Sequence, residues 1–362
     1  MLVSESIVFT GGGTGGHVFP ALAVVEELKS LWQGRIIWIG SNKGIERQLL
    51  EATGIPFFGI PAGKLRRYFS IKNIIDIFRV IGGLAVSLHI LARERPLLLF
   101  SKGGYVSVPP VIAARLLGIR VITHESDAQP GLATRINSRF AEKILISFSE
   151  SAGYFSDKMR KRVVQVGNPV RKDLFEGKKK CGRHLVGCPE NKKVLLVLGG
   201  SQGSAQINYL IRNNLDRLTK ACFVVHQAGR VDFREGKQQN YFTAPFFGDE
   251  LKHLLAAADL VVCRAGANTL WELAALGKPA VLIPLPRSAS RGDQLLNAEI
   301  FARNGAAVVL PENDTSGIRL LEIILDLLDN KKKLKQMESR ARSLSFPGSA
   351  AKIAELIFAY GH

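Results

Sequence analysis

The sequence predicts an α/β protein with two Rossmann-like, doubly wound domains that face a cleft. Strand-like apolar runs alternate with amphipathic helix-like stretches, which is typical of a parallel sheet with helices on both faces. A strand, a glycine-rich turn and a helix-like stretch open the chain, and the same order restarts at Val194. The length of 362 residues suffices for two domains, and the composition, 46% hydrophobic and 22% charged, is that of a globular protein.

The first strand, Ile7 to Phe9, runs into the turn Gly11 to His17 and then into a helix, Val18 to Leu28. Such a turn brings backbone N–H groups close to a ligand, and the positive end of the helix favours an anion, usually phosphate. A structural turn and a dinucleotide site can share this glycine spacing. The dinucleotide is disfavoured because the second strand, Arg35 to Gly40, is followed by no carboxylate before Glu46. We expect a phosphate-bearing ligand of another kind.

The remaining strands expected in the first half are Leu97 to Phe100, Arg120 to His124, Lys143 to Phe148 and Val163 to Val166. Proline and glycine make Val166 to Arg171 a rigid turn that suits a crossing between domains. We therefore expect a first domain over 1–166 and a second over 167–346. After the Pro347-Gly348 break, Ala350 to Tyr360 is apolar at helical spacing, which predicts a lone helix within 347–362 that packs back on one domain.

The second half repeats the opening pattern with a strand from Val194 to Leu198, a turn from Gly199 to Gly203 and a helix from Ala205 to Leu215. Further expected strands are Cys222 to Gln227, Leu260 to Arg264, Ala280 to Pro284 and Ala306 to Leu310. This restart is the reason for expecting two domains in tandem.

The formal net charge of +18 predicts attraction to anionic partners such as nucleic acid, acidic lipid or phosphorylated substrates. Charges interrupt the apolar stretch from Ile71 to Leu91, and a signal-peptide pattern is absent from the N-terminus. We expect a cytosolic protein with, at most, peripheral membrane contact. Cys181 and Cys188 flank His184 at a spacing that fits no zinc pattern, so free thiols on a surface loop are expected there.

Ligands of open α/β sheets bind beyond the carboxyl ends of the strands, so the loops that follow the strands are the candidate sites. The unusual loops are Gly11 to His17, Ser101 to Ser107, His124 to Asp127, Gly199 to Gly203, Arg264 to Thr269 and Arg287 to Asn297. If both domains point these ends at one another, the loops converge on one cleft.

The segment from Gly266 to Glu272 has two interpretations. In the first, Asn268 or Thr269 simply caps a helix, and Glu272 is favourable near its positive end. In the second, the helix N–H groups face a diphosphate and the Glu272 carboxylate accepts hydrogen bonds from ribose hydroxyls. The other glycine loops favour this second interpretation, a nucleotide-binding site.

Taken together, these motifs resemble the MurG family, which transfers N-acetylglucosamine from UDP-N-acetylglucosamine to lipid I. The resemblance spans nearly the whole chain in the family's order. It rests on GGTGGH at Gly12 to His17, SKGGYVS at Ser101 to Ser107, HES at His124 to Ser126, VGNPVR at Val166 to Arg171, GGSQG at Gly199 to Gly203, CRAGANT at Cys263 to Thr269, and Gln294 with Asn297-Ala298.

The resemblance implies the glycosyltransferase B fold, with acceptor and membrane side in the N-terminal domain and the sugar nucleotide largely in the C-terminal one. It also implies that the C-terminal helix returns to the first domain. The implied donor contacts are Thr14, Gly15 and Gly16 with the sugar and diphosphate, Arg171 and Ser201 with the diphosphate, Phe247 with the uracil, Ala267, Asn268 and Thr269 with the phosphates, Glu272 with the ribose, and Gln294 with the sugar hydroxyls. Asp127 and Asp293 depart from members that carry asparagine and glutamine there.

The implied reaction is an inverting attack by the muramyl C4 hydroxyl on the anomeric carbon, which forms lipid II and releases UDP. A base must take the hydroxyl proton. His17 is the first candidate because imidazole titrates near neutral pH, although it could instead hold the loop by a hydrogen bond. Glu125 and Asp127 are rival bases. Enzymes of this fold generally use no bound metal, so neither a metal nor a cofactor is expected.

The stretch from Lys64 to Ile81 combines basic residues with a broad apolar face, which fits either a core helix with a basic edge or an interfacial membrane contact. The lipid-linked acceptor favours the membrane, through Arg66, Arg67, Lys72, Ile75, Phe78 and Arg79. We expect a peripheral protein on the cytoplasmic face of the cell membrane, with UDP-N-acetylglucosamine, lipid I, an anionic membrane surface and other cell-wall synthesis proteins as partners. Nucleic acid is not expected, because no reader motif accompanies the charge. The alternatives are an inverting transferase of this fold acting on a diacylglycerol, and a non-catalytic nucleotide- or nucleic-acid-binding protein.

Overall fold

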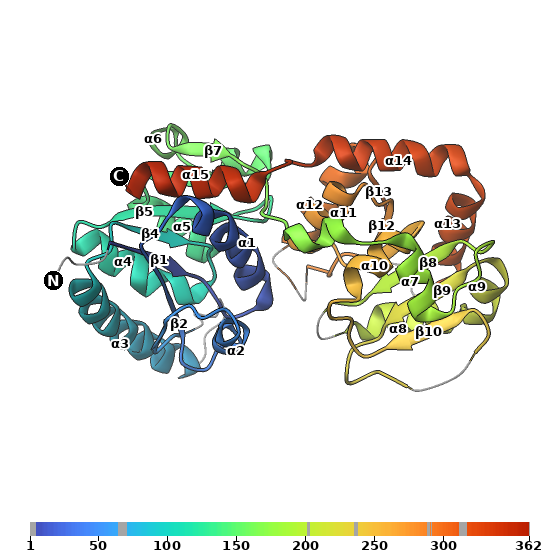
Figure 1. Cartoon of the computed structure of the whole chain (residues 1–362), viewed down its shortest axis with the longest axis horizontal. Coiled ribbons are helices and arrows are strands. Elements are labelled where there is room, and N and C mark those ends of the chain that lie inside the picture. The colour runs from blue at the N-terminus through green and yellow to red at the C-terminus, as the bar shows by residue number, and fades with distance from the viewer. Residues whose placement is uncertain are drawn as a thin grey trace. The chain divides into compact units, whose positions relative to one another are not determined.

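The computed structural model describes residues 5–63, 71–200, 203–234, 238–287, 290, 292–310 and 317–361, with the backbone alone described over 71–75. The chain divides into two compact units (Figure 1). The first comprises Met1–Arg171 with Gly348–His362, and the second comprises Lys172–Pro347. Both are parallel α/β units, which confirms the predicted fold class.

The first unit contains a parallel sheet whose described strands follow the order β3-β2-β1-β4-β5-β6-β7. Their bounds are β1 (Ser6–Thr10), β2 (Arg35–Ser41), β3 (Phe57–Ile60), β4 (Leu98–Ser101), β5 (Arg120–Glu125), β6 (Lys143–Ile146) and β7 (Val163–Gln165). Strand β3 was not predicted from the sequence. Only four residues form this edge strand, Pro56 and Pro61 flank it, and Gly59 lies within it, so its sequence lacks the usual pattern of a strand.

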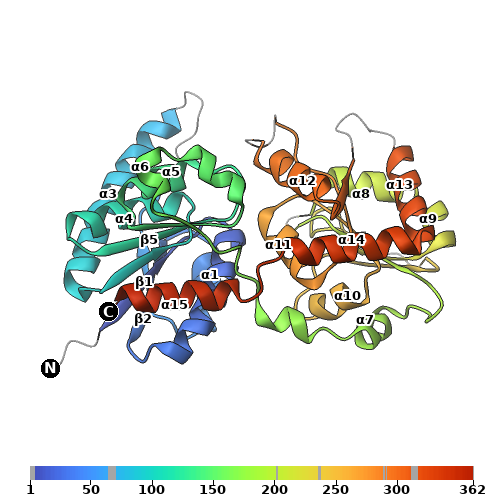
Figure 2. The same ribbon diagram turned by 90° about the horizontal axis from the view of Figure 1, so that it is seen from above.

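Two helical layers cover this sheet. The helices are α1 (Gly15–Leu31), α2 (Glu46–Glu51), α3 (Ile71–Glu94), α4 (Val108–Leu116), α5 (Leu132–Phe140), α6 (Asp157–Arg160) and α15 (Ser349–Gly361). Alternate residues of β1 face opposite sides, so Phe9 enters one core and Val8 the other. Helix α15 lies along α1, where Ile353 and Ile357 are fully buried (Figure 2). The C-terminal helix therefore belongs to the first unit.

The second unit repeats this winding with the strand order β10-β9-β8-β11-β12-β13, all parallel. Its strands are β8 (Val194–Leu198), β9 (Phe223–Gln227), β10 (Tyr241–Ala244), β11 (Leu260–Cys263), β12 (Ala280–Leu282) and β13 (Ala307–Val309). Its α-helices are α7 (Lys179–Val186), α8 (Ala205–Arg212), α9 (Leu215–Ala221), α10 (Leu251–Ala257), α11 (Ala267–Leu276), α12 (Asp293–Arg303), α13 (Ile318–Asp329) and α14 (Lys331–Leu344). The edge strand β10 was not predicted either, because it also has only four residues and Pro245 follows it directly.

Two local expectations for this unit are wrong. Cys181 and His184 lie in helix α7, not in a surface loop, because Gly182 lets α7 approach the α10 backbone: a Cβ there would come within 2.1 Å of the His253 carbonyl oxygen. All four cysteines are free thiols. The helix expected over Ala205 to Leu215 ends at Arg212. Just beyond this end, the Asn214 side chain donates to the Leu210 and Gly317 carbonyls and interrupts the backbone hydrogen-bond pattern of the helix.

Candidate functional site

The glycine motifs lie where the strand order of each sheet reverses. In the first sheet β1 and β4 are neighbours, so Gly11–His17 and Ser101–Ser107 follow adjacent strand ends. In the second sheet β8 and β11 are neighbours, so the loop that begins at Gly199 and the segment Arg264–Thr269 follow adjacent strand ends. Ligands of doubly wound sheets bind at such switch points. Each unit therefore presents one candidate ligand site built from two of the predicted loops.

The first turn is closely packed around its glycines. Gly13 has φ +84°, and a Cβ there would come within 2.5 Å of the Tyr105 ring. Helix α1 starts after Thr14 with no side-chain cap and with no acidic residue in its first turn. Its positive end, which carries the backbone of Gly15 and Gly16, is therefore not neutralised by the helix's own side chains and suits a phosphate.

Glu46 is a site residue that sequence reasoning did not assign. Its carboxylate is fully buried and accepts hydrogen bonds from the backbone N–H of Gly13 at 3.2 Å and of Ser41 at 2.7 Å. In dinucleotide sites the carboxylate after the second strand instead holds a ribose. Because both Glu46 oxygens hold the protein's own backbone, this geometry argues against a dinucleotide site.

His17 lies half-buried in the first turn of α1, beside the second glycine loop. Its Nδ1 is 3.2 Å from the Lys102 carbonyl oxygen. A carbonyl only accepts, so Nδ1 carries the proton and Nε2 is the acceptor nitrogen of the neutral ring. A Cβ at Gly104 would come within 3.3 Å of Nε2 and 3.0 Å of Cδ2, so a larger residue there would press on the imidazole.

The two rival carboxylates differ in their surroundings. Glu125 is buried and accepts from the backbone N–H of Asp127 and of Gly131, each at 3.0 Å. These bonds hold the loop that follows β5, and they favour a bracing role for Glu125 over proton transfer. Asp127 is half-buried at the same loop.

The segment from Val166 to Arg171 packs with the first unit. His124 Nε2 donates to the Gly167 carbonyl at 2.9 Å, and Ser126 Oγ donates to Asn168 Oδ1 at 3.0 Å. The Arg171 guanidinium lies 5.6 Å from the centre of the Phe19 ring on α1. These contacts place the boundary between the units after Arg171, whereas the sequence suggested Val166.

In the second unit two further residues connect the predicted loops. Gln227 Nε2 donates to the Gly200 carbonyl, and its Oε1 accepts from the Phe247 backbone N–H, both at 2.9 Å. The buried Phe247 segment is thereby tied to the glycine turn. Arg264 donates to Ser204 Oγ at 2.7 Å and to the Ile283 carbonyl at 2.9 Å. Sequence reasoning assigned no role to either side chain, because their partners are distant in sequence.

Other predicted donor contacts lie on α11 and α12 or just before α8. Gly266, not Asn268 or Thr269, occupies the N-cap of α11, and no side chain caps the helix. The capping interpretation is therefore wrong: Ala267, Asn268 and Thr269 form the first turn, and Glu272 lies in the second. Gln294 Oε1 accepts from the Leu285 backbone N–H at 3.1 Å. Ser201 lies outside the described residues.

Helix α3 carries exposed apolar side chains. Phe78 is 67% exposed and Ile81 57%, and both are far above the exposure of a core helix. Arg79 pairs with the buried carboxylate of Asp76 at 3.0 Å. Arg66 and Arg67 lie outside the described residues, as do the side chains of Lys72 and Ile75. Within the described part of the chain, none of the helices is long and apolar enough to span a bilayer.

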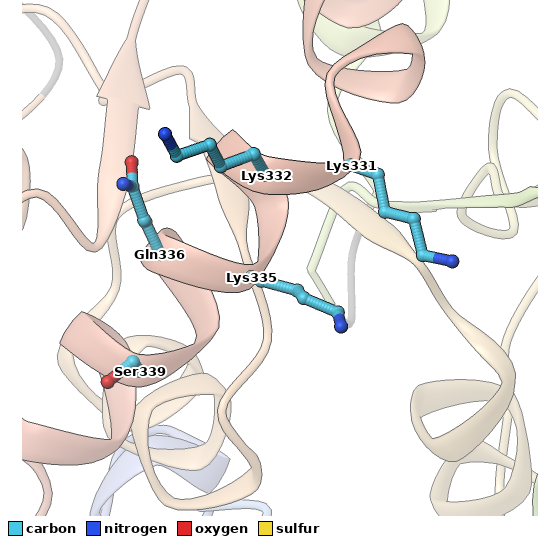
Figure 3. A pocket seen from close by; sticks show the side chains of 5 residues that line it. All are labelled: Lys331, Lys332, Lys335, Gln336 and Ser339. Atoms are coloured by element: carbon cyan, nitrogen blue, oxygen red, sulfur yellow. The ribbon is translucent and has the colours of Figure 1, made fainter.

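A separate surface hollow lies on α14, where Lys331 and Lys335 point to one side and Lys332 and Gln336 to the other (Figure 3). Ser339 completes its lining. The hollow contains none of the predicted site residues.

Comparisons with known proteins identify the family of the chain. Residues 7–146 match the glycosyltransferase family 28 N-terminal domain, and residues 194–355 match the C-terminal domain of the same family. The UDP-N-acetylglucosamine–N-acetylmuramyl-(pentapeptide) pyrophosphoryl-undecaprenol N-acetylglucosamine transferase of Treponema denticola is 43% identical over 98% of this chain and 97% of its own length. The Clostridium perfringens protein of the same name is 45% identical over 90% of this chain and 91% of its own length.

Solved structures give the same result. The crystal structure of Acinetobacter baumannii MurG superposes with a TM-score of 0.74 at 26% identity and covers 98% of this chain and 99% of its own. A UDP-GlcNAc 2-epimerase from Neisseria meningitidis reaches a TM-score of 0.70 at 13% identity over 98% of this chain and 100% of its own, a likeness of fold alone.

Proposed function

The chain belongs to glycosyltransferase family 28 and, within it, to the MurG family, and from this we infer that it transfers N-acetylglucosamine from UDP-N-acetylglucosamine to lipid I and forms lipid II. The observation that carries this conclusion is the near full-length similarity to transferases of that name. The substrates are UDP-N-acetylglucosamine and lipid I. A diacylglycerol acceptor and a non-catalytic binding role are not favoured, because the relatives that match nearly the whole chain are named as transferases acting on N-acetylmuramyl-(pentapeptide) pyrophosphoryl-undecaprenol.

The donor is assigned to the second unit. The first turn of α11, from Ala267 to Thr269, presents backbone N–H groups to the diphosphate, together with Ser201. The segment around Phe247 meets the uracil through its backbone, because the Phe247 side chain is buried. Glu272 accepts from the ribose hydroxyls, and Gln294 contacts the sugar through Nε2, since its Oε1 already accepts from Leu285.

The acceptor reacts at the first unit. The turn formed by Thr14, Gly15 and Gly16 lies against the donor sugar and diphosphate during transfer, and Arg171 supplies a cation to the leaving group. The acceptor C4 oxygen forms a bond with the anomeric carbon while the bond from that carbon to UDP breaks. The hydroxyl proton passes to Nε2 of His17, and the departing diphosphate takes the electron pair.

The same unit docks on the membrane. Phe78 and Ile81 enter the headgroup boundary, while Arg66, Arg67 and Lys72 meet anionic lipid. Arg79 contributes less to the attraction for anionic lipid than the other basic residues, because its charge is already paired with that of Asp76. We propose the cytoplasmic face of the cell membrane as its location, with other cell-wall synthesis proteins as partners.

A UDP-release assay tests the proposal. The full-length protein is given UDP-N-acetylglucosamine with a lipid I analogue, with a diacylglycerol, and with no acceptor. Release that depends on the lipid I analogue supports the function. Release only with diacylglycerol assigns the alternative acceptor, and nucleic-acid binding without any UDP release would indicate a non-catalytic protein.

Glu272→Ala is expected to weaken UDP and UDP-N-acetylglucosamine alike. Loss of a hydrogen bond to a charged group costs roughly 1.5–3 kcal/mol, or about ten- to a hundredfold in Kd. Titration calorimetry with both ligands measures it. Glu322→Ala, which removes an exposed carboxylate from α13, is the matched control. Unchanged UDP affinity in Glu272→Ala would remove this residue from the site.

Gln294→Ala is expected to erode the preference for N-acetylglucosamine over N-acetylgalactosamine by about tenfold while UDP affinity stays within about threefold. The amide distinguishes the orientation of hydroxyls on the transferred sugar, and UDP alone lacks that sugar. The measurement is kcat/KM for the two donors, with Glu299→Ala on the exposed side of α12 as control. An undiminished preference would assign sugar reading to another residue.

A further inference from the structure

Lys102 is a fully buried lysine whose ammonium takes no part in the proposed reaction. It follows β4 directly, and its side chain is only 1% exposed. Lysine is almost never fully buried unless its ammonium is paired, because burial removes a strongly hydrated charge from water. A buried ammonium beside a ligand-binding loop therefore needs a reason.

The contacts of Lys102 join several loops of the first unit. Its Nζ donates to Ser126 Oγ, and Ser126 Oγ donates in turn to Asn168 Oδ1 at 3.0 Å. Its backbone N–H donates to the Thr10 carbonyl at 2.9 Å, and its carbonyl accepts from His17. One residue thus connects the end of β1 and the start of α1 with the loop after β5 and the Val166–Arg171 segment.

Among the described residues, the titratable groups that act on this ammonium are His124, Glu125 and Asp127 from β5 and its loop, whereas His17 from α1 contacts the backbone carbonyl of Lys102. Burial lowers the pKa of Lys102 to about 8, and the two carboxylates act in the opposite direction. Burial and the Lys102 charge hold the pKa of His124 well below its usual value, so this imidazole is neutral. The cation is present at neutral pH and is lost as the pH rises through about 8.

The chain of hydrogen bonds from Lys102 through Ser126 ends at Asn168, three residues before Arg171. Asn168 is buried, Pro169 follows it and fixes the next φ angle, and the preceding Gly167 carbonyl is held by His124. The backbone is therefore held at two successive positions just before Arg171. Without a charged donor, the Ser126 hydroxyl can rotate away from Asn168, and the segment loses one of these two restraints.

We propose that Lys102 is a positioning residue for the transfer reaction, which holds the Val166–Arg171 segment through Ser126 and Asn168 so that Arg171 meets the donor diphosphate. Lys102 touches no substrate itself, because its side chain is buried. The inference rests on the proposed function, in which Arg171 binds the diphosphate.

The test measures KM for UDP-N-acetylglucosamine and kcat from pH 6.5 to 9.5 in the parent, Lys102→Met, Ser126→Ala and the exposed control Lys29→Met. Lys102→Met keeps the length of the side chain without its charge. It should raise KM about tenfold, the size of one lost charge-assisted hydrogen bond, and change kcat less than about threefold. In the parent KM should rise above about pH 8, and this rise should vanish in Lys102→Met.

A double-mutant cycle completes the test. If Lys102 acts through Arg171, Lys102→Met should add little to the KM of Arg171→Ala. The milder Ser126→Ala should reproduce part of the KM increase even if Lys102→Met fails to fold. An active parent with unchanged KM and an unchanged pH profile in both variants, or full additivity in the cycle, would overturn the inference. A parent that releases no UDP with the lipid I analogue would instead overturn the proposed function.

Discussion

Replacement of His17 by alanine is expected to lower kcat for transfer roughly 10²- to 10⁴-fold, the usual contribution of a general base. The Lys102 carbonyl accepts the hydrogen bond from the Nδ1–H group of His17, which leaves Nε2 as the basic nitrogen. The Kd for UDP should stay within about threefold, because His17 is assigned to the acceptor hydroxyl and not to UDP. Single-turnover transfer to a lipid I analogue and calorimetry with UDP measure the two quantities.

His17→Asn separates catalysis from loop bracing. The asparagine amide can still donate to the Lys102 carbonyl, yet it has no basic nitrogen, so this variant should be about as slow as His17→Ala. Asp127→Asn is the matched control, because it keeps the shape of the side chain and removes the rival carboxylate, and it should retain activity. If His17→Asn instead keeps activity while Asp127→Asn is slow and UDP binding persists in both, the base is Asp127 and His17 serves to hold the loop.

The sequence predicted the fold class and the loops of the site because these depend on local patterns. Buried parallel strands such as Val194–Leu198 are continuous apolar runs, and glycine turns such as Gly11–His17 are visible as residue types in order. The edge strands β3 and β10 were not predicted, because each has only four residues and lies next to a proline.

The residues that hold the loops together could not be found in the same way. Glu46, the first residue of α2, accepts a hydrogen bond from the turn at Gly13. Gln227, the last residue of β9, connects Gly200 with Phe247. Lys102 looked like one position of a glycine motif, although it is fully buried. Such roles depend on which distant segments meet, and that follows from strand order, not from spacing along the chain.

Introducing charge on the apolar face of α3 is expected to abolish membrane docking. Phe78 and Ile81 are 67% and 57% exposed, so glutamate at both positions should not disturb the core. Burying a large apolar side chain contributes roughly 1.5–3 kcal/mol, and each basic residue near an anionic surface about 1 kcal/mol. Losing both apolar contacts should weaken vesicle binding at least about a hundredfold. Sedimentation with phosphatidylglycerol-rich vesicles measures it.

Two controls make this experiment specific to α3: a change of salt concentration and a substitution at an exposed leucine on another helix. High salt screens the contribution of the basic residues but not the apolar contacts, so the parent should retain part of its binding at high salt and the Phe78→Glu/Ile81→Glu variant should not. Leu116→Glu, at a 65% exposed position at the end of α4, is the matched control and should bind as the parent does. Activity of the double variant on a short-chain, water-soluble acceptor should survive, because neither residue belongs to the glycine loops. If the double variant binds vesicles normally and Leu116→Glu does not, the membrane surface lies around α4 and the exposed face of α3 has another use.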